Sequence, residues 1–182
     1  MTSAPERRPD NDTYYMGVAM AVRERATCTG NRIGAVAVLQ NRIIAPGSNG
    51  VPEGMKNCLE GGCLRCRNPK GRFPSGTGYD PWICGHAEQN LLWSAARFGI
   101  AGEGATIYST MQPCFAWGKE LLQAKVRRIV SLHPGTPSDA DPEMDSSQKA
   151  EHEKLRAKCE MKRLPIKDLR AKGAVTALRK KS

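Results

Sequence analysis

Two short motifs restrict this fold more than any other part of the sequence: His86-Ala87-Glu88 and, 27 residues after His86, Pro113-Cys114. Each motif stands before a run of helical periodicity, so His86 and Cys114 are expected at the N-termini of two helices. An imidazole and a thiolate are typical zinc ligands, and a helix start favours the thiolate form. Glu88 would reach a water molecule at the metal and move protons without binding the metal itself. Both helices should then begin on the same side of one sheet.

A second group of chemically informative residues lies in the stretch 55–84, which has few helix or strand signals and many Gly, Pro and Cys. Cys58, Cys63 and Cys66 stand at zinc-like spacing, and Cys84 follows further on. A structural zinc would stabilise this insertion, which has little apolar mass of its own. The alternative is that these are free buried cysteines. Seven cysteines, an odd number, fit metal binding in a reducing compartment better than a disulfide framework, so we expect a cytoplasmic protein.

Composition predicts one domain and argues against a membrane protein. A chain of 182 residues is a single-domain size, and no run approaches the ~18 apolar residues of a membrane span. We expect a flexible N-terminus over 1–13, a domain over 14–166 and a basic tail over 167–182. The net charge is +10, and +8 of it falls in residues 149–182. The tail could bind nucleic acid, but the last aromatic residue is Trp117, so we favour a solvated helix face.

Hydrophobic periodicity alternates between helix and strand, which predicts an α/β fold with a sheet covered by helices. Helices are expected over 14–26, from His86 to a stop at Gly99, and over 117–124, 146–159 and 167–180. Strands are expected over 33–39, 42–45, 105–109, 126–132 and 160–166. The first two strands should form a hairpin through Gln40-Asn41, with a loop over 46–54 after it.

These pieces occur in the order and spacing of a known family. Over roughly residues 14–135 the chain resembles the deoxycytidylate deaminase branch of the cytidine deaminase superfamily, in which His-x-Glu and Pro-Cys-x-x-Cys form the zinc-and-acid signature. The matching motifs are Cys28, Ile33-Gly34-Ala35-Val36, Arg42-Ile43-Ile44, Asn49-Gly50-x-Pro52-x-Gly54, Asn57-Cys58, Gly62-Cys63, His86-Ala87-Glu88-Gln89-Asn90, Ala96-Arg97-Phe98-Gly99, Gly104-Ala105-Thr106-Ile107-Tyr108 and Pro113-Cys114.

The resemblance implies a three-layer fold with a mixed five-stranded sheet flanked by helices, and a homo-oligomer. It also implies hydrolytic conversion of cytosine to uracil in a free deoxynucleotide of the dCMP or dCTP type, with a catalytic zinc on His86 and Cys114 and Glu88 as the proton shuttle. Asn49, Ala87 and Phe115 match substrate-binding positions, although Asn49 could cap a turn instead and Phe115 could belong to the core.

Resemblance also adds Cys28 to the cysteines of the insertion as a ligand of a second, structural zinc. Five thiols then compete for four positions. They are Cys28, Cys58, Cys63, Cys66 and Cys84.

One part of the family signature is missing. The third zinc ligand is expected three residues after Cys114, but this position is Trp117, and an indole ring has no lone pair for a metal. A two-ligand site should bind zinc weakly. Three explanations stay open: a variant made or selected to be inactive, a natural member that has lost catalysis, or an active enzyme in which Cys84 or another nearby group supplies the ligand. We favour a deaminase whose chemistry is impaired.

Two other functions remain as alternatives. One is a non-catalytic nucleotide-binding protein on the same fold, and the other is a deaminase that acts on a base in single-stranded nucleic acid.

Overall fold

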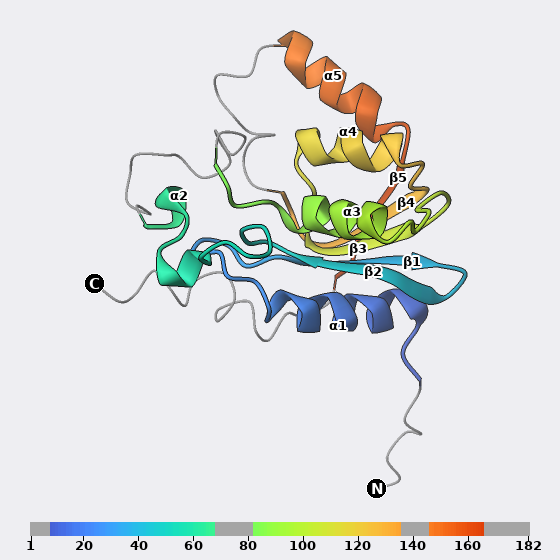
Figure 1. The fold of residues 1–182 in the computed structure, drawn as a ribbon. Coiled ribbons are helices and arrows are strands. Elements are labelled where there is room, and N and C mark those ends of the chain that lie inside the picture. The colour runs from blue at the N-terminus through green and yellow to red at the C-terminus, as the bar shows by residue number, and fades with distance from the viewer. Residues whose placement is uncertain (1–7, 68–81, 136–145, 166–182) are drawn as a thin grey trace, which may run out of the picture.

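In the computed structural model, which describes residues 8–67, 82–135 and 146–165, a five-stranded sheet lies between two layers of helices (Figure 1). Helix α1 covers one face, α3 and α4 cover the other, and α5 lies over α4. The elements are α1 (Asn11–Arg23), β1 (Gly34–Leu39), β2 (Arg42–Ser48), η1 (Cys58–Glu60), α2 (Leu64–Arg67), α3 (Ala87–Arg97), β3 (Thr106–Met111), α4 (Phe115–Gln123), β4 (Arg128–His133), α5 (Ser146–Arg156) and β5 (Glu160–Arg163). The predicted three-layer α/β fold is confirmed.

The sheet is mixed, as predicted, with strand order β2-β1-β3-β4-β5. Strand β1 pairs antiparallel with β2 and β3, whereas β3, β4 and β5 are parallel. Each parallel pair is joined by a crossover that contains a helix, α4 and then α5, as parallel strands require. This topology brings the N-termini of α3 and α4 to the same face of the sheet (Figure 1).

The hairpin between β1 and β2 has the predicted turn. Gln40 and Asn41 both have left-handed backbones, with φ of 49° and 60°, which is the pattern of a two-residue type I′ turn. The predicted loop over 46–54 is wrong at its start, because β2 continues to Ser48, which pairs with Gly34. Pro46 fits in this strand because β2 is at the edge of the sheet. Proline has no backbone N–H, and an edge strand can hold it without losing a hydrogen bond to a neighbouring strand.

Alternating side chains of the strands build two cores. On the α3 side lie Ala35, Ala37, Ala45, Ala87, Leu91, Ala95, Ile107, Leu121, Val126 and Ile129. On the α1 side lie Tyr15, Met16, Ala19, Val36, Val38, Tyr108, Val130, Leu132 and Leu164. The residues of β1 divide between the two cores by the period of two that a strand imposes.

Helix α1 begins at Asn11, three residues before the predicted start, because Asp10 caps it: the Asp10 carboxylate accepts a hydrogen bond of 2.7 Å from the backbone N–H of Thr13. Helices α3 and α4 have His86 and Cys114 as N-cap residues. Gly99, with φ of 63°, follows the end of α3 as expected. Helix α4 begins at Phe115, two residues before the predicted start.

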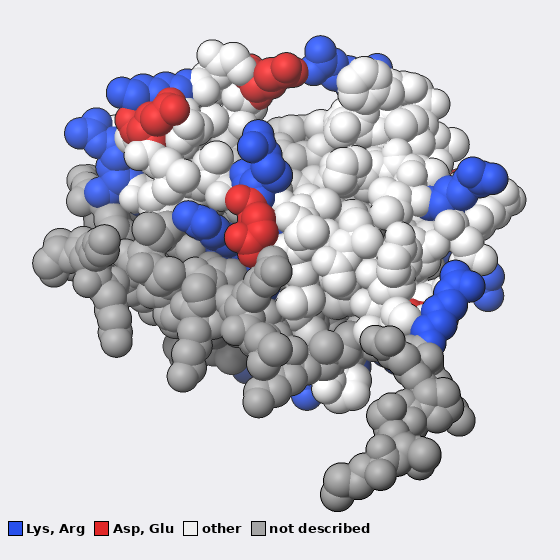
Figure 2. Space-filling model, turned by 90° about the horizontal axis from the view of Figure 1, so that it is seen from below, with Lys and Arg blue, Asp and Glu red and all other residues white. Residues whose placement is uncertain are grey.

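Several expectations fall on residues outside the described ones: the final helix over 167–180, the basic tail over 167–182, and most of the flexible N-terminus over 1–13. On the face that carries α1, Lys and Arg side chains lie scattered, some beside Asp or Glu side chains, instead of forming one stripe (Figure 2). Among the described helices, none has the length and apolar character needed to cross a membrane.

Candidate metal and catalytic site

The starts of α3 and α4 bring His86 and Cys114 together, as the motifs predict. The Nδ1 atom of His86 lies 4.0 Å from the Sγ atom of Cys114, and both side chains are half-buried. Two ligands of one tetrahedral zinc, with bonds of roughly 2.1 Å to nitrogen and 2.3 Å to sulfur, stand about 3.6 Å apart. These two residues therefore fit a shared zinc ion after a small adjustment.

Trp117 occupies the third position and does not fit a zinc ligand. Its ring centroid lies 5.5 Å from that of His86, with the two planes tilted by 51°. The indole is therefore beside the imidazole, where the family signature has a thiolate. Cys84 is placed elsewhere: its Sγ atom lies 3.6 Å from that of Cys58, within the cysteine-rich insertion. The described residues near His86 thus provide two of the three expected donors.

Glu88 lies in the first turn of α3 and points toward the sheet. It is only 2% exposed, and its Oε1 atom accepts a hydrogen bond of 2.5 Å from the hydroxyl of Ser109 on β3. Burial raises the pKa of Glu88, and the Ser109 hydrogen bond offsets part of that rise. A raised pKa makes the protonated form of Glu88 more accessible, which suits a group that both accepts and donates a proton, as a general acid–base does.

The start of α3 is held by close contacts with neighbouring segments. The backbones of Gly50 and Gly85 exchange two hydrogen bonds, of 2.9 and 3.2 Å. The side-chain amide of Asn90 donates to the carbonyl of Ser48 at 2.8 Å. Gly47 lets α3 approach β2, because a Cβ atom there would lie 2.3 Å from the carbonyl oxygen of Ala87. These contacts fix His86 and Glu88 relative to the sheet edge.

Asn49, which matches a substrate-binding position, uses its side chain within the protein. Its Nδ2 atom donates to the carbonyl of Asn31 at 2.7 Å, and its Oδ1 atom accepts from the backbone N–H of Ile33 at 2.8 Å. Asn49 therefore joins the end of β2 to the segment before β1. One amide hydrogen and one oxygen lone pair are left for a ligand, so substrate contact stays a prediction.

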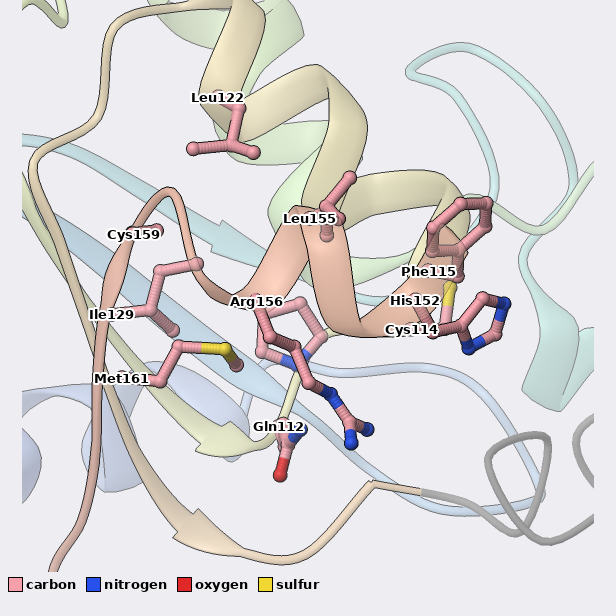
Figure 3. A pocket seen from close by; sticks show the side chains of 12 residues that line it. Gln112, Cys114, Phe115, Leu122, Ile129, His152, Leu155, Arg156, Cys159 and Met161 are labelled. Carbon is pink, nitrogen blue, oxygen red and sulfur yellow. The ribbon is translucent and has the colours of Figure 1, made fainter. Parts of the chain in front are cut away.

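Ala87 and Phe115, which match substrate-binding positions, both pack against other parts of the protein. Ala87 is fully buried and belongs to the core beneath α3. The Phe115 ring stacks on His152 of α5, with centroids 3.9 Å apart, beside a small cavity that Cys114 also lines (Figure 3). Substrate contact by Ala87 and Phe115 stays a prediction.

The five cysteines predicted for a structural zinc gather in one cluster. Cys58, Cys63, Cys66 and Cys84 are buried together, and Cys28 packs against them. The Sγ atoms are 3.6 Å apart in two pairs, Cys28 with Cys66 and Cys58 with Cys84. The edge of a zinc-centred tetrahedron of thiolates is about 3.8 Å, since each Zn–S bond is roughly 2.3 Å. Hydrogen bonds from neighbouring thiols hold the pKa of Cys66 well below its usual value.

Sequence reasoning missed Ser109 and the pairing of Gly50 with Gly85. One feature of the sequence could have indicated Ser109. It is two residues after Ile107 on the same strand, so both side chains point toward α3, and a hydroxyl group is unusual on the buried face of a strand. The glycine pairing has no local signal, because the two residues are 35 positions apart in the sequence and meet only through the fold.

A mixed sheet with an imidazole and a thiol at two helix starts on one face, and a buried carboxyl group on one of those helices, is an α/β arrangement that could hold a metal ion beside an acid–base group. The family described as "Cytidine and deoxycytidylate deaminase zinc-binding region" matches residues 9–133. The chain therefore belongs to the cytidine and deoxycytidylate deaminase family.

Similar proteins agree with this assignment. The deoxycytidylate deaminase of Schizosaccharomyces pombe is 37% identical over 123 residues, which cover 68% of this chain and 37% of the yeast protein. The deoxycytidylate deaminase of Mycobacterium phage D29 is 34% identical over 128 residues, covering 68% of this chain and 94% of the phage protein. The chain spans about two fifths of the two yeast relatives it matches. The dCMP deaminase of cyanophage S-TIM5, solved with dCMP and dUMP, shares the fold with a TM-score of 0.62 at 23% identity, over 87% of this chain and all of that one.

Proposed function

We propose that this protein hydrolyses the amino group of cytosine in a free deoxycytidine nucleotide of the dCMP or dCTP type, and that Trp117 reduces this activity. The observation that carries the proposal is the approach of His86 to Cys114, 4.0 Å between Nδ1 and Sγ, at the helix start that also bears buried Glu88. Relatives named deoxycytidylate deaminase, and a structural neighbour solved with dCMP and dUMP, support the choice of substrate.

The proposed chemistry assigns distinct tasks to the residues. A zinc ion held by His86 and Cys114 would act as a Lewis acid toward the attacking water. Glu88 would take a proton from that water, deliver it to the ring nitrogen of cytosine, and pass the next proton to the departing ammonia. Water and cytosine thus become uracil and ammonia, with no further reactant. Burial raises the pKa of Glu88, which suits a group that must both accept and release protons.

The test is a deamination assay on the full chain and its Glu88→Gln variant. The panel contains dCMP, dCTP, CMP, adenosine nucleotides and single-stranded oligonucleotides, and the readout is ammonia release with chromatographic detection of the uracil product. We expect slow turnover of a deoxycytidine nucleotide that disappears in the variant. Turnover confined to oligonucleotides or adenosine compounds would contradict the proposal.

The second candidate function is a nucleotide-binding protein without catalysis, and the position of Trp117 beside His86 favours it. Calorimetric titration with dCMP and dUMP distinguishes the two candidates. Tight binding of both nucleotides, together with no turnover in either the parent or a Trp117→Cys variant, would establish the non-catalytic function and contradict the deaminase.

We further propose that Cys28, Cys58, Cys66 and Cys84 hold a structural zinc and that Cys63 is not a ligand. The two 3.6 Å sulfur pairs supply these four residues and leave out Cys63. The fifth thiol, Cys63, is fully buried within 4.8 Å of Cys58 and Cys66, so its variant is a matched control for a buried cysteine of the same cluster.

Zinc per chain, measured by atomic emission in the parent, Cys58→Ser and Cys63→Ser proteins, tests this assignment. We expect Cys58→Ser to lose about one zinc equivalent, or to bind it far more weakly, and to melt at a lower temperature, because the insertion depends on the metal for stability. Cys63→Ser should keep the full zinc content. Unchanged zinc in both variants, or loss in Cys63→Ser alone, would contradict the assignment.

Assembly and location remain predictions. We propose a homo-oligomer in the cytoplasm that takes a small nucleotide, with the basic tail as a less favoured contact for nucleic acid. Light scattering that gives a monomer at micromolar concentration would argue against the oligomer.

A further inference from the structure

We propose that Ser109 is a positioning residue for deamination, whose hydroxyl holds one oxygen of the Glu88 carboxylate so that the other remains available to water and substrate. This inference rests on the proposed function of Glu88 as the proton shuttle. Ser109 would act through Glu88 without touching the reacting atoms.

The hydrogen bond between Ser109 and Glu88 is buried and joins Glu88 to a central strand of the sheet. Ser109 is fully buried in β3, Glu88 is 2% exposed, and the hydroxyl oxygen lies 2.5 Å from Oε1 of the carboxylate. Within the described ranges, Ser109 is the one side chain that hydrogen-bonds to Glu88. A central strand of a sheet moves little, so the bond fixes the carboxylate relative to a rigid element.

Neighbouring strands place small residues in the same row. Ala35 on β1 and Ser131 on β4 both pair with Ser109 in register, and both are buried. The row Ala35, Ser109 and Ser131 therefore presents only small side chains where the Glu88 carboxyl group meets the sheet. A larger residue at position 109 would compete with Glu88 for space.

Loss of the hydroxyl should change the orientation of Glu88 more than the fold. In Ser109→Ala, the carboxylate would have no side-chain donor on the sheet side and could rotate within its site. A proton shuttle contributes a factor of roughly 10²–10⁴ to rate only when it is aligned with the atoms that exchange protons. The interaction is needed in the transition state and not for nucleotide binding, so kcat should fall while KM stays similar.

The experiment compares Ser109→Ala with Ser131→Ala, a matched control that removes a buried hydroxyl from the same row of the sheet. Both changes are made in the parent and in a Trp117→Cys background, so that turnover is high enough to measure. We expect Ser109→Ala to lower kcat by about 10-fold to 100-fold, with KM for dCMP and the affinity for dUMP nearly unchanged. Ser131→Ala should keep the parental kcat. An unchanged kcat in Ser109→Ala, or an equal loss in Ser131→Ala, would overturn the positioning role.

Crystal structures of the two variants give a readout that does not depend on turnover. A Glu88 carboxylate that is rotated in Ser109→Ala and unmoved in Ser131→Ala supports the proposal. A carboxylate that is unmoved in both variants overturns it. If the parent and the Trp117→Cys protein deaminate none of the nucleotides tested, the proposed function fails, and these structures still decide whether Ser109 positions Glu88.

Discussion

Trp117 stands at the third ligand position of the candidate metal site, which has only His86 and Cys114 as donors among the described residues. Its indole lies beside the His86 imidazole, with 5.5 Å between ring centroids, at the helix position where the family signature has a cysteine. An aromatic ring supplies stacking surface but no metal donor. Trp117 should therefore weaken zinc binding at His86 and Cys114.

Trp117→Cys should raise the zinc content by about one equivalent per chain and increase turnover, because three protein ligands can hold zinc where two hold it weakly. Atomic emission and the deamination assay measure the two effects. Trp117→Ala is the control, since it removes the ring without supplying a donor. Full zinc at His86 and undiminished turnover in the parent would show that Trp117 is no obstacle.

At the scale of elements, the position of α3 depends on how closely it approaches β2. A Cβ atom at Gly47 would lie 2.3 Å from the carbonyl oxygen of Ala87 and 2.6 Å from the backbone nitrogen of Leu91. Both are backbone atoms of the helix, so they cannot rotate away. Gly47 is thus needed for the packing that places His86 and Glu88 at the sheet edge.

Gly47→Ala should therefore lower the free energy of unfolding by about 3 kcal/mol, because α3 must shift away from β2. Gly17→Ala is the control. Gly17 lies on the exposed side of α1, where an added Cβ would meet nothing within 4 Å. That change should stabilise the protein by about 0.5–1 kcal/mol, since alanine favours a helix interior. Urea unfolding monitored by circular dichroism measures both effects, and equal behaviour of the two variants would contradict the packing argument.

At the scale of the whole molecule, Asp12 ties the α1 layer to three strands of the sheet. Its carboxylate accepts two hydrogen bonds from Arg128, of 2.7 and 2.9 Å, one of 2.7 Å from Lys162 and one of 2.9 Å from Tyr108. The Arg128 guanidinium is the main reason that the pKa of Asp12 lies far below its usual value. Because Asp12 is 14% exposed, water screens this network only in part.

Stability should depend on this network in acid. A depressed pKa stabilises the fold at pH values above the unfolded pKa of about 4, and this contribution declines as the pH falls below that value. Asp12→Asn should lower the free energy of unfolding by about 2 kcal/mol or more at pH 7, because Arg128 and Lys162 lose their shared anion.

Urea unfolding of both proteins at pH 7 and pH 2 measures this effect. The difference between parent and variant should be smaller at pH 2. A difference that does not change with pH would contradict the electrostatic account. The Arg128 pair with Glu160, 2.6 Å between Nε and Oε1, remains in the variant and keeps β4 joined to β5.

Much of the fold was predictable because the decisive signals act over a few residues. Gln40-Asn41 specifies a hairpin turn, Gly99 follows the end of α3, and His86 and Cys114 begin helices, since caps and turns depend on nearby backbone geometry. The end of β2 was missed because a proline usually interrupts a strand, and only the sheet order shows that β2 is at an edge.

By itself, the sequence determined the chemistry that is available: an imidazole, a thiolate and a carboxylate at two helix starts, five clustered thiols, and an indole in place of a ligand. Only the tertiary structure decided which groups meet. Ser109 reaches Glu88 across 21 positions, and Cys28 reaches Cys66 across 38. The contact between Ser109 and Glu88 depends on strand register and on how closely α3 approaches the sheet. Both are set by packing over the whole domain, which no local pattern in the sequence encodes.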